Sequence, residues 1–88
     1  MSLASSNVTI GTTPTLIATG IVGASYVYLH APTGGNAVYV GGSTVTTANG
    51  LELAKGAVIQ IWLPEADKLY GVVASATQPL MVLQSGGR

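Results

Sequence analysis

The stretch that decides the fold is Ala57-Val58-Ile59-Gln60-Ile61-Trp62-Leu63, which ends at Pro64. It is rich in β-branched and aromatic residues, and it is too short and too continuously apolar for an amphipathic helix. A five-residue turn over 64–68 separates it from a second apolar run over 69–74. We therefore expect two strands, paired as a hairpin.

Both faces of this predicted hairpin are apolar. One face pairs Ile61 with Gly71 and Ile59 with Val73, and the other carries Gln60, Trp62, Tyr70 and Val72. An antiparallel sheet with one face in solvent should alternate apolar and polar residues. A domain of this size has one core, which covers one face. The second face therefore predicts a partner, and it indicates an assembly protein instead of an enzyme.

The composition supports this interpretation. The chain has 88 residues, enough for one domain, and a domain of this size buries only about 60–65% of the surface that its unfolded form exposes. Charged residues make up 7% and hydrophobic residues 48%, with mean hydropathy +0.52 and zero net charge. Soluble monomers usually have a charged surface and a net charge away from zero. Burial in an assembly suits this composition better.

Several classes of function are disfavoured by the sequence. Three basic residues are too few to bind a phosphate backbone, so we expect no nucleic acid. No apolar run approaches the ~20 residues that cross a bilayer, so we expect no membrane partner. The absence of cysteine excludes disulfides and thiolate metal sites. The start of the chain has neither a basic segment nor an apolar segment typical of a secretory signal, so we expect assembly in a cytoplasm.

The sequence predicts short strands along the whole chain. Turn signals recur about every 8–12 residues, without helical periodicity, which is typical of an all-β fold. We expect a small antiparallel β-sandwich or barrel of about seven to eight short strands and no helix. Residues 1–6 are predicted to be a flexible arm with Leu3 as its only anchor, 7–84 a single β-domain, and 85–88 a loose tail.

A second hairpin is predicted over 24–40. Matching the apolar faces pairs Leu29 with Val38 and Val27 with Val40. A slip of one residue would bring a tyrosine into the core, so the pattern specifies this register strongly. The outer face of this hairpin then carries Tyr26, Tyr28, His30 and Tyr39.

Candidate catalytic and metal-binding groups are few. Glu65 and Asp67 could share a calcium ion, since this cation prefers oxygen ligands, but a solvated hairpin tip is the simpler interpretation. Ser25 or Ser43 with His30 and Asp67 would supply the residue types of a hydrolytic triad, but no G-x-S-x-G segment is present. We therefore predict no catalytic residue, no metal and no cofactor.

The aromatic residues are the stronger functional candidates. Exposed tyrosine and tryptophan side chains anchor protein interfaces and can stack on sugars. The alternative is that loops or the second sheet of the same chain cover some of them. The predicted contact residues are Trp62, Tyr70, Met81, Val72, Tyr28, Tyr39, Tyr26 and Leu3.

From Val38 to Leu83 the chain resembles a family of small β-proteins encoded among the structural genes of tailed bacteriophages. The matching segments are Val38-Tyr39-Val40-Gly41-Gly42-Ser43, Val45-Thr46, Asn49-Gly50-Leu51, Leu53, Gly56 and Leu69-Tyr70-Gly71-Val72-Val73-Ala74-Ser75, and the opening over 8–14 is similar too. Ala76 and Thr77 depart from the pattern, which has a glycine-led turn there. The resemblance implies a head-decoration (cement) or other virion-surface protein, often trimeric.

Together these observations predict a capsid decoration protein on the surface of the virion. It would bind the major capsid protein and other copies of itself, with a trimer favoured, and would reinforce the head lattice through apolar and aromatic contacts. The N-terminal arm would become ordered on the shell. Two alternatives remain open, namely a tail, baseplate or fibre module, and a carbohydrate-binding β-sandwich.

Overall fold

Eight β-strands make up the computed structural model, which describes residues 2–32 and 36–86, with side chains for 4–32 and 36–85. They are β1 (Ser2–Ile10), β2 (Thr15–Thr19), β3 (Ser25–His30), β4 (Val38–Gly41), β5 (Leu51–Leu53), β6 (Val58–Leu63), β7 (Lys68–Val72) and β8 (Gln78–Gly86). No helix long and apolar enough to cross a membrane occurs in this part of the chain.

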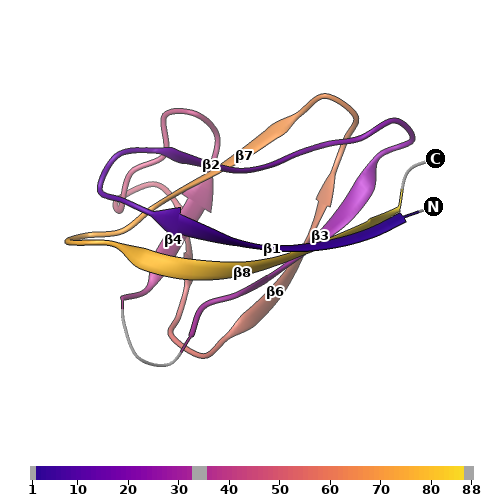
Figure 1. The fold of residues 1–88 in the computed structure, drawn as a ribbon. Helices are drawn as coiled ribbons and strands as arrows, with labels where there is room; N and C mark the ends of the chain where they lie inside the picture. The colour runs from indigo at the N-terminus through magenta and orange to yellow at the C-terminus, as the bar shows by residue number, and fades with distance from the viewer. Residues whose placement is uncertain (1, 33–35, 87–88) are drawn as a thin grey trace.

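The strands form two four-stranded antiparallel sheets (Figure 1). Sheet A has the order β1-β8-β3-β6, and sheet B has the order β2-β7-β4-β5. Apart from β4 and β5, consecutive strands lie in different sheets. This is the strand order of a jelly roll. The prediction of a small all-β antiparallel sandwich with seven to eight strands is confirmed.

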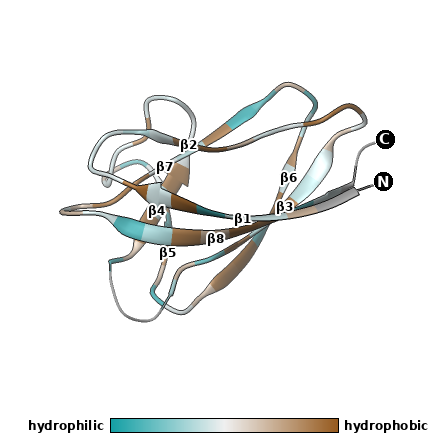
Figure 2. Ribbon diagram, in the orientation of Figure 1, coloured by the Kyte–Doolittle hydropathy of each residue, from teal (hydrophilic) through white to brown (hydrophobic). Residues whose placement is uncertain are grey.

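The core lies between the sheets because inward positions alternate with outward ones along each strand. Val27 and Leu29 of β3, Val38 of β4 and Leu80 of β8 are completely buried. The apolar character continues beyond these inward positions. Most of the length of the strands is neutral to hydrophobic (Figure 2). The outward positions are therefore less polar than in a sheet that alternates apolar and polar residues.

Both predicted hairpins are wrong in their pairing, although their inward faces are correct. β6 pairs with β3, whereas β7 pairs with β2 and β4. Likewise β3 lies in sheet A and β4 in sheet B. In both cases the connection crosses the sandwich, so the two apolar rows face each other across the core. Paired in one sheet, the same rows would need a separate element to cover them.

The termini also differ from the prediction. Residues 2–6, predicted to be a flexible arm, belong to β1 and pair with β8 in a continuous register from Ser2↔Gly86 to Ile10↔Gln78. β8 extends to Gly86, so residues 85 and 86 of the predicted loose tail are part of a strand. The two strands run side by side and bring the two ends of the chain together (Figure 1).

Two glutamines from β8 hold the two ends of the core. Gln84 points inward, and its Nε2 donates to the Thr19 carbonyl and to Ser25 Oγ, both at 3.0 Å. Gln78 is buried, and its Oε1 accepts a hydrogen bond of 2.7 Å from the Asn36 amide. Buried amides need such partners. These bonds link segments that are distant in the sequence and connect β8 to β2 of sheet B, to β3 of its own sheet and to the segment before β4.

Candidate interaction face

The outer face of sheet A gathers exposed apolar and aromatic side chains from strands that are distant in the sequence. Register places Tyr26 of β3 directly opposite Trp62 of β6, and His30 of β3 between Met81 of β8 and Val58 of β6. Trp62 is 57% exposed, Val58 66%, Tyr26 46% and Met81 40%. Large apolar side chains that are directly opposite one another form a continuous exposed patch.

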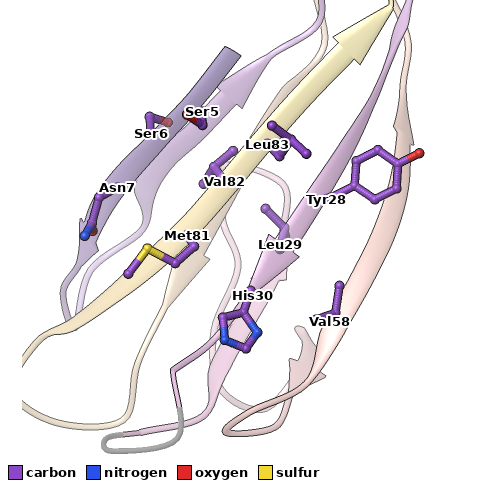
Figure 3. A pocket seen from close by; sticks show the side chains of 10 residues that line it. All are labelled: Ser5, Ser6, Asn7, Tyr28, Leu29, His30, Val58, Met81, Val82 and Leu83. Atoms are coloured by element: carbon purple, nitrogen blue, oxygen red, sulfur yellow. The ribbon is translucent and has the colours of Figure 1, made fainter. Parts of the chain in front are cut away.

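A shallow hollow of about 590 Å³ crosses this face (Figure 3). Asn7, Met81, His30 and Val58 line it in a row that runs across all four strands of the sheet. Tyr28 and Leu83, which are cross-strand neighbours, form the next row. The hollow is therefore a feature of the paired strands themselves, and the rigid sheet fixes its shape.

No Lys, Arg, Asp or Glu occurs in any of the four strands of sheet A. The acidic and basic residues that the structure describes lie in β5, in β7 and in the turns around them, at Glu52, Lys55, Glu65, Asp67 and Lys68. A solvent-facing sheet normally alternates apolar with polar or charged residues. This face lacks the charges that keep a free surface hydrated.

His30 is one of two titratable side chains that line the hollow, together with Tyr28. Its Nδ1 atom is buried and has no hydrogen-bond partner among the described residues. A buried polar atom without a partner is costly.

The residues considered for catalysis lie apart. Ser25 points into the core and accepts the hydrogen bond from Gln84, whereas His30 of the same strand points outward. Asp67 lies in the turn between β6 and β7, exposed to solvent. Within 2–32 and 36–86 no three His, Cys, Asp or Glu residues lie close enough to hold a metal ion. The triad drawn from the sequence is not assembled.

The predicted contact residues are divided between the two outer faces of the sandwich. Tyr26, Tyr28, Trp62 and Met81 lie on the outer face of sheet A. Tyr39, Tyr70 and Val72 lie on sheet B, with Tyr39 opposite Val72 and Tyr70 opposite Gly41. The prediction of one face shared by Trp62, Tyr70 and Val72 is therefore wrong, because β6 and β7 belong to different sheets. The side chain of Leu3 lies outside the described residues.

Val72 is also wrong as an exposed contact, since only 3% of its surface is accessible. The connection between β4 and β5 folds back over sheet B. Its Val45 is 4% exposed and lies so close that a Cβ on Gly41 would come within 3.0 Å of Val45 Cγ2. Val45, Val72 and Pro14 together line a smaller depression on this side. Loops of the same chain thus cover part of sheet B and leave sheet A open.

Sequence reasoning missed Val58, Leu83 and Asn7 as members of the open face. Val58 and Leu83 were interpreted only as strand residues, and Asn7 as the start of a strand. The alternation of β6 carried the signal for Val58, because Val58, Gln60 and Trp62 share one side. Leu83 and Asn7 could not be assigned without knowing that β8 lies between β1 and β3.

The comparisons with known proteins are limited to the fold. No protein-family model and no curated protein matches the sequence. The structure is similar to a chain from a solved structure of Bacillus endospore appendages, described as a novel family of disulfide-linked pili. The TM-score is 0.62, with 20% sequence identity over 99% of this chain and 87% of that chain. Similarity at this level of identity shows a shared fold.

Proposed function

We propose that the chain is a structural protein that functions as a subunit of a larger assembly, with the outer face of sheet A buried against neighbouring subunits. The observation that carries this proposal is an outer face four strands wide without a formal charge, on which β3, β6 and β8 expose apolar and aromatic side chains. Desolvating such a face costs little, and the aromatic side chains supply large contact areas.

The partner surface that fits is apolar and uncharged. A charged partner would lose its hydration without gaining an opposite charge. A second copy of this chain meets this description, because its own sheet A presents the same uncharged face. Many copies, each with a modest contact, hold together through effective concentration once they are arranged in a lattice or an oligomer.

The form of the assembly that we propose is the surface of a phage head, with the major capsid protein and other copies of this chain as partners. The resemblance of 38–83 to small phage virion proteins supports this choice. The pilus chain offers support for a structural role in general, since it belongs to an endospore appendage described as a pilus. This chain contains no cysteine, so no disulfide can join the subunits of its assembly.

Sedimentation velocity on the purified chain tests the proposal. The wild type is expected to sediment as a species larger than the 8.8 kDa monomer, with a concentration-dependent distribution. Met81→Lys places a charge at the centre of the face, where β8 lies between β1 and β3, and should shift the protein to the monomer. Leu51→Lys is the matched control, because Leu51 is 57% exposed but lies on sheet B.

The proposal fails if the wild type remains a monomer at every concentration, or if Met81→Lys and Leu51→Lys have the same effect. Circular dichroism of both variants verifies that the fold is intact. A chain that stays monomeric and shows a change in tryptophan fluorescence with neutral polysaccharide would point to the carbohydrate-binding alternative instead.

A further inference from the structure

The edges of sheet A differ from those of sheet B. An edge strand exposes main-chain N–H and C=O groups that can pair with another chain, and proteins usually protect it with charges, bulges or short length. In sheet B, β2 has a register shift between Leu16 and Ala18, and β5 is three residues long and carries Glu52. Both edges of sheet B are therefore protected.

Sheet A has no such protection. Its edge strand β1 is nine residues long, has no charge and no proline, and keeps an unbroken register with β8. The opposite edge, β6, has six residues, again without a charge or a proline. Two long, uncharged and regular edges on one sheet favour pairing with another strand.

The core is incompletely covered at the same two edges. Val8 of β1 and Ile59 and Ile61 of β6 face inward and pack against the core, but they are only partly buried. Their partners on the inner strands, Leu80, Leu29 and Val27, are completely buried. A strand added at either edge would cover these half-buried side chains.

The strand directions select which edges meet. Each neighbouring pair in the order β1-β8-β3-β6 is antiparallel, so β6 runs antiparallel to β1. A second copy in the same orientation, placed beside β6, presents its own β1 antiparallel to that strand. The alternation of the sheet then continues across the boundary between the copies.

The side chains at the two edges are complementary in size. On the outer face β1 carries Ser5 and Asn7, and β6 carries Gln60 in the row of Ser5 and Val58 in the row of Asn7. Cross-strand pairs of a small and a large side chain pack without collision, and the lack of charges on both edges removes repulsion.

We propose that β1 of one copy pairs with β6 of a second copy, so that sheet A continues from one subunit to the next. The inference deepens the proposed function and rests on it, since it names a second copy of the chain as one of the neighbouring subunits. The contact joins two different edges and leaves a free β1 and a free β6. It therefore propagates into a ring or a filament and does not close as a two-fold dimer.

Introduced cysteines test the pairing cleanly, because the chain has none of its own. Ser5→Cys and Gln60→Cys, carried on two differently tagged chains, are mixed and oxidised. We expect a cross-linked dimer that contains both tags, and no dimer above background from either variant alone. A mixture of Ser5→Cys with Leu51→Cys, which lies on β5, is the control and should give no cross-link.

The double variant Ser5→Cys/Gln60→Cys should form a ladder of oligomers. A bond within one chain is not possible, because three strand spacings of about 4.8 Å separate the two edges and a disulfide needs Cα atoms within about 7 Å. If Gln60→Cys fails to fold by circular dichroism, the pair Asn7→Cys and Val58→Cys, from the neighbouring row across the sheet, replaces it.

Two results would overturn the pairing. Cross-linking of Ser5→Cys with itself would indicate a two-fold contact of β1 with β1. No mixed cross-link at concentrations where the wild type is oligomeric would exclude the edges as the contact. Met81→Lys tests the face separately, because it leaves both edges intact. If Met81→Lys abolishes assembly while the cysteine pair gives no mixed cross-link, the proposed function stands and the edge pairing alone is overturned.

Discussion

Gly20 is the position at which an added methyl group should lower the free energy of unfolding most. It lies between β2 and β3 against the turn that joins β6 to β7, and a Cβ there would collide with the Pro64 carbonyl oxygen and come within 2.7 Å of the Pro64 carbonyl carbon. Its amide donates to the Asp67 carbonyl at 2.7 Å, and its carbonyl accepts from the Ala66 amide at 3.1 Å. Both atoms that collide are main-chain atoms, so Gly20→Ala must separate the two segments.

The size of the effect follows from these contacts. Losing two hydrogen bonds costs about 1 kcal/mol each, and overpacking adds about 1–3 kcal/mol. We expect a total of about 3–5 kcal/mol, against a free energy of unfolding of roughly 4–13 kcal/mol for a domain of this size. The melting temperature should fall by about 15–25 °C, since 1 kcal/mol corresponds to about 5 °C here.

Urea unfolding followed by the fluorescence of Trp62, the only tryptophan, measures this loss. Gly42→Ala is the control, because nothing lies within 4 Å of a Cβ at Gly42, and it should change the free energy by less than about 0.5 kcal/mol. A Gly20→Ala variant within about 1 kcal/mol of the wild type would refute the close approach of the two segments.

Three further substitutions test separate parts of the structure. Trp62→Ala removes the side chain with the largest exposed aromatic area: burying 57% of roughly 250 Å² contributes up to about 3.5 kcal/mol. Self-association measured by sedimentation equilibrium should therefore weaken by up to ~300-fold, whereas Leu51→Ala, equally exposed on sheet B, should leave it unchanged. Gln84→Ala removes two hydrogen bonds inside the sandwich and should lower the free energy of unfolding by about 1–3 kcal/mol; no loss would mean that these bonds do not hold the end of the core. Ala76 has a left-handed backbone with φ of 58°, which is costly for a residue with a Cβ, so Ala76→Gly should stabilise the protein by about 1 kcal/mol. Ala74→Gly, at an exposed position without positive φ, should instead be neutral or destabilising in the same urea titration.

Local alternation was sufficient to identify the strands and their inward sides. Val27 and Leu29 on one strand, and Val38 and Val40 on another, are buried as the pattern predicts. Pairing could not be predicted in the same way. A turn such as 64–67 can join two strands of one sheet or carry the chain from one sheet to the other, and the sequence of the turn is compatible with both.

Polar residues account for the other differences. Glutamine is usually exposed, yet Gln78 and Gln84 both point into the sandwich, where Asn36 and Thr19 supply partners. Residues 2–6 are small and polar, which is typical of a flexible end. Their pairing partners lie about 80 residues away at the other end of β8, where no local pattern could identify them.

The excess of apolar surface was predictable, but its location was not. Composition and the apolar outer rows indicated a buried second face. The structure leaves the apolar outer side chains of sheet A open, whereas the connection around Val45 covers part of sheet B. Tyr70 and Val72 were predicted as contact residues but lie on sheet B. Val58 and Leu83, which were not predicted, lie on the outer face of sheet A.

Acrylamide quenching of Trp62 fluorescence, measured across a dilution series with the sedimentation coefficient recorded at each concentration, tests the central claim most directly. The indole is the only one in the chain and lies on the outer face of sheet A. Quenching should be strong in the dilute monomer, where the side chain is 57% exposed, and should fall as the larger species forms. Equal quenching at every concentration, or a chain that never assembles, would contradict a face that is buried against neighbouring subunits.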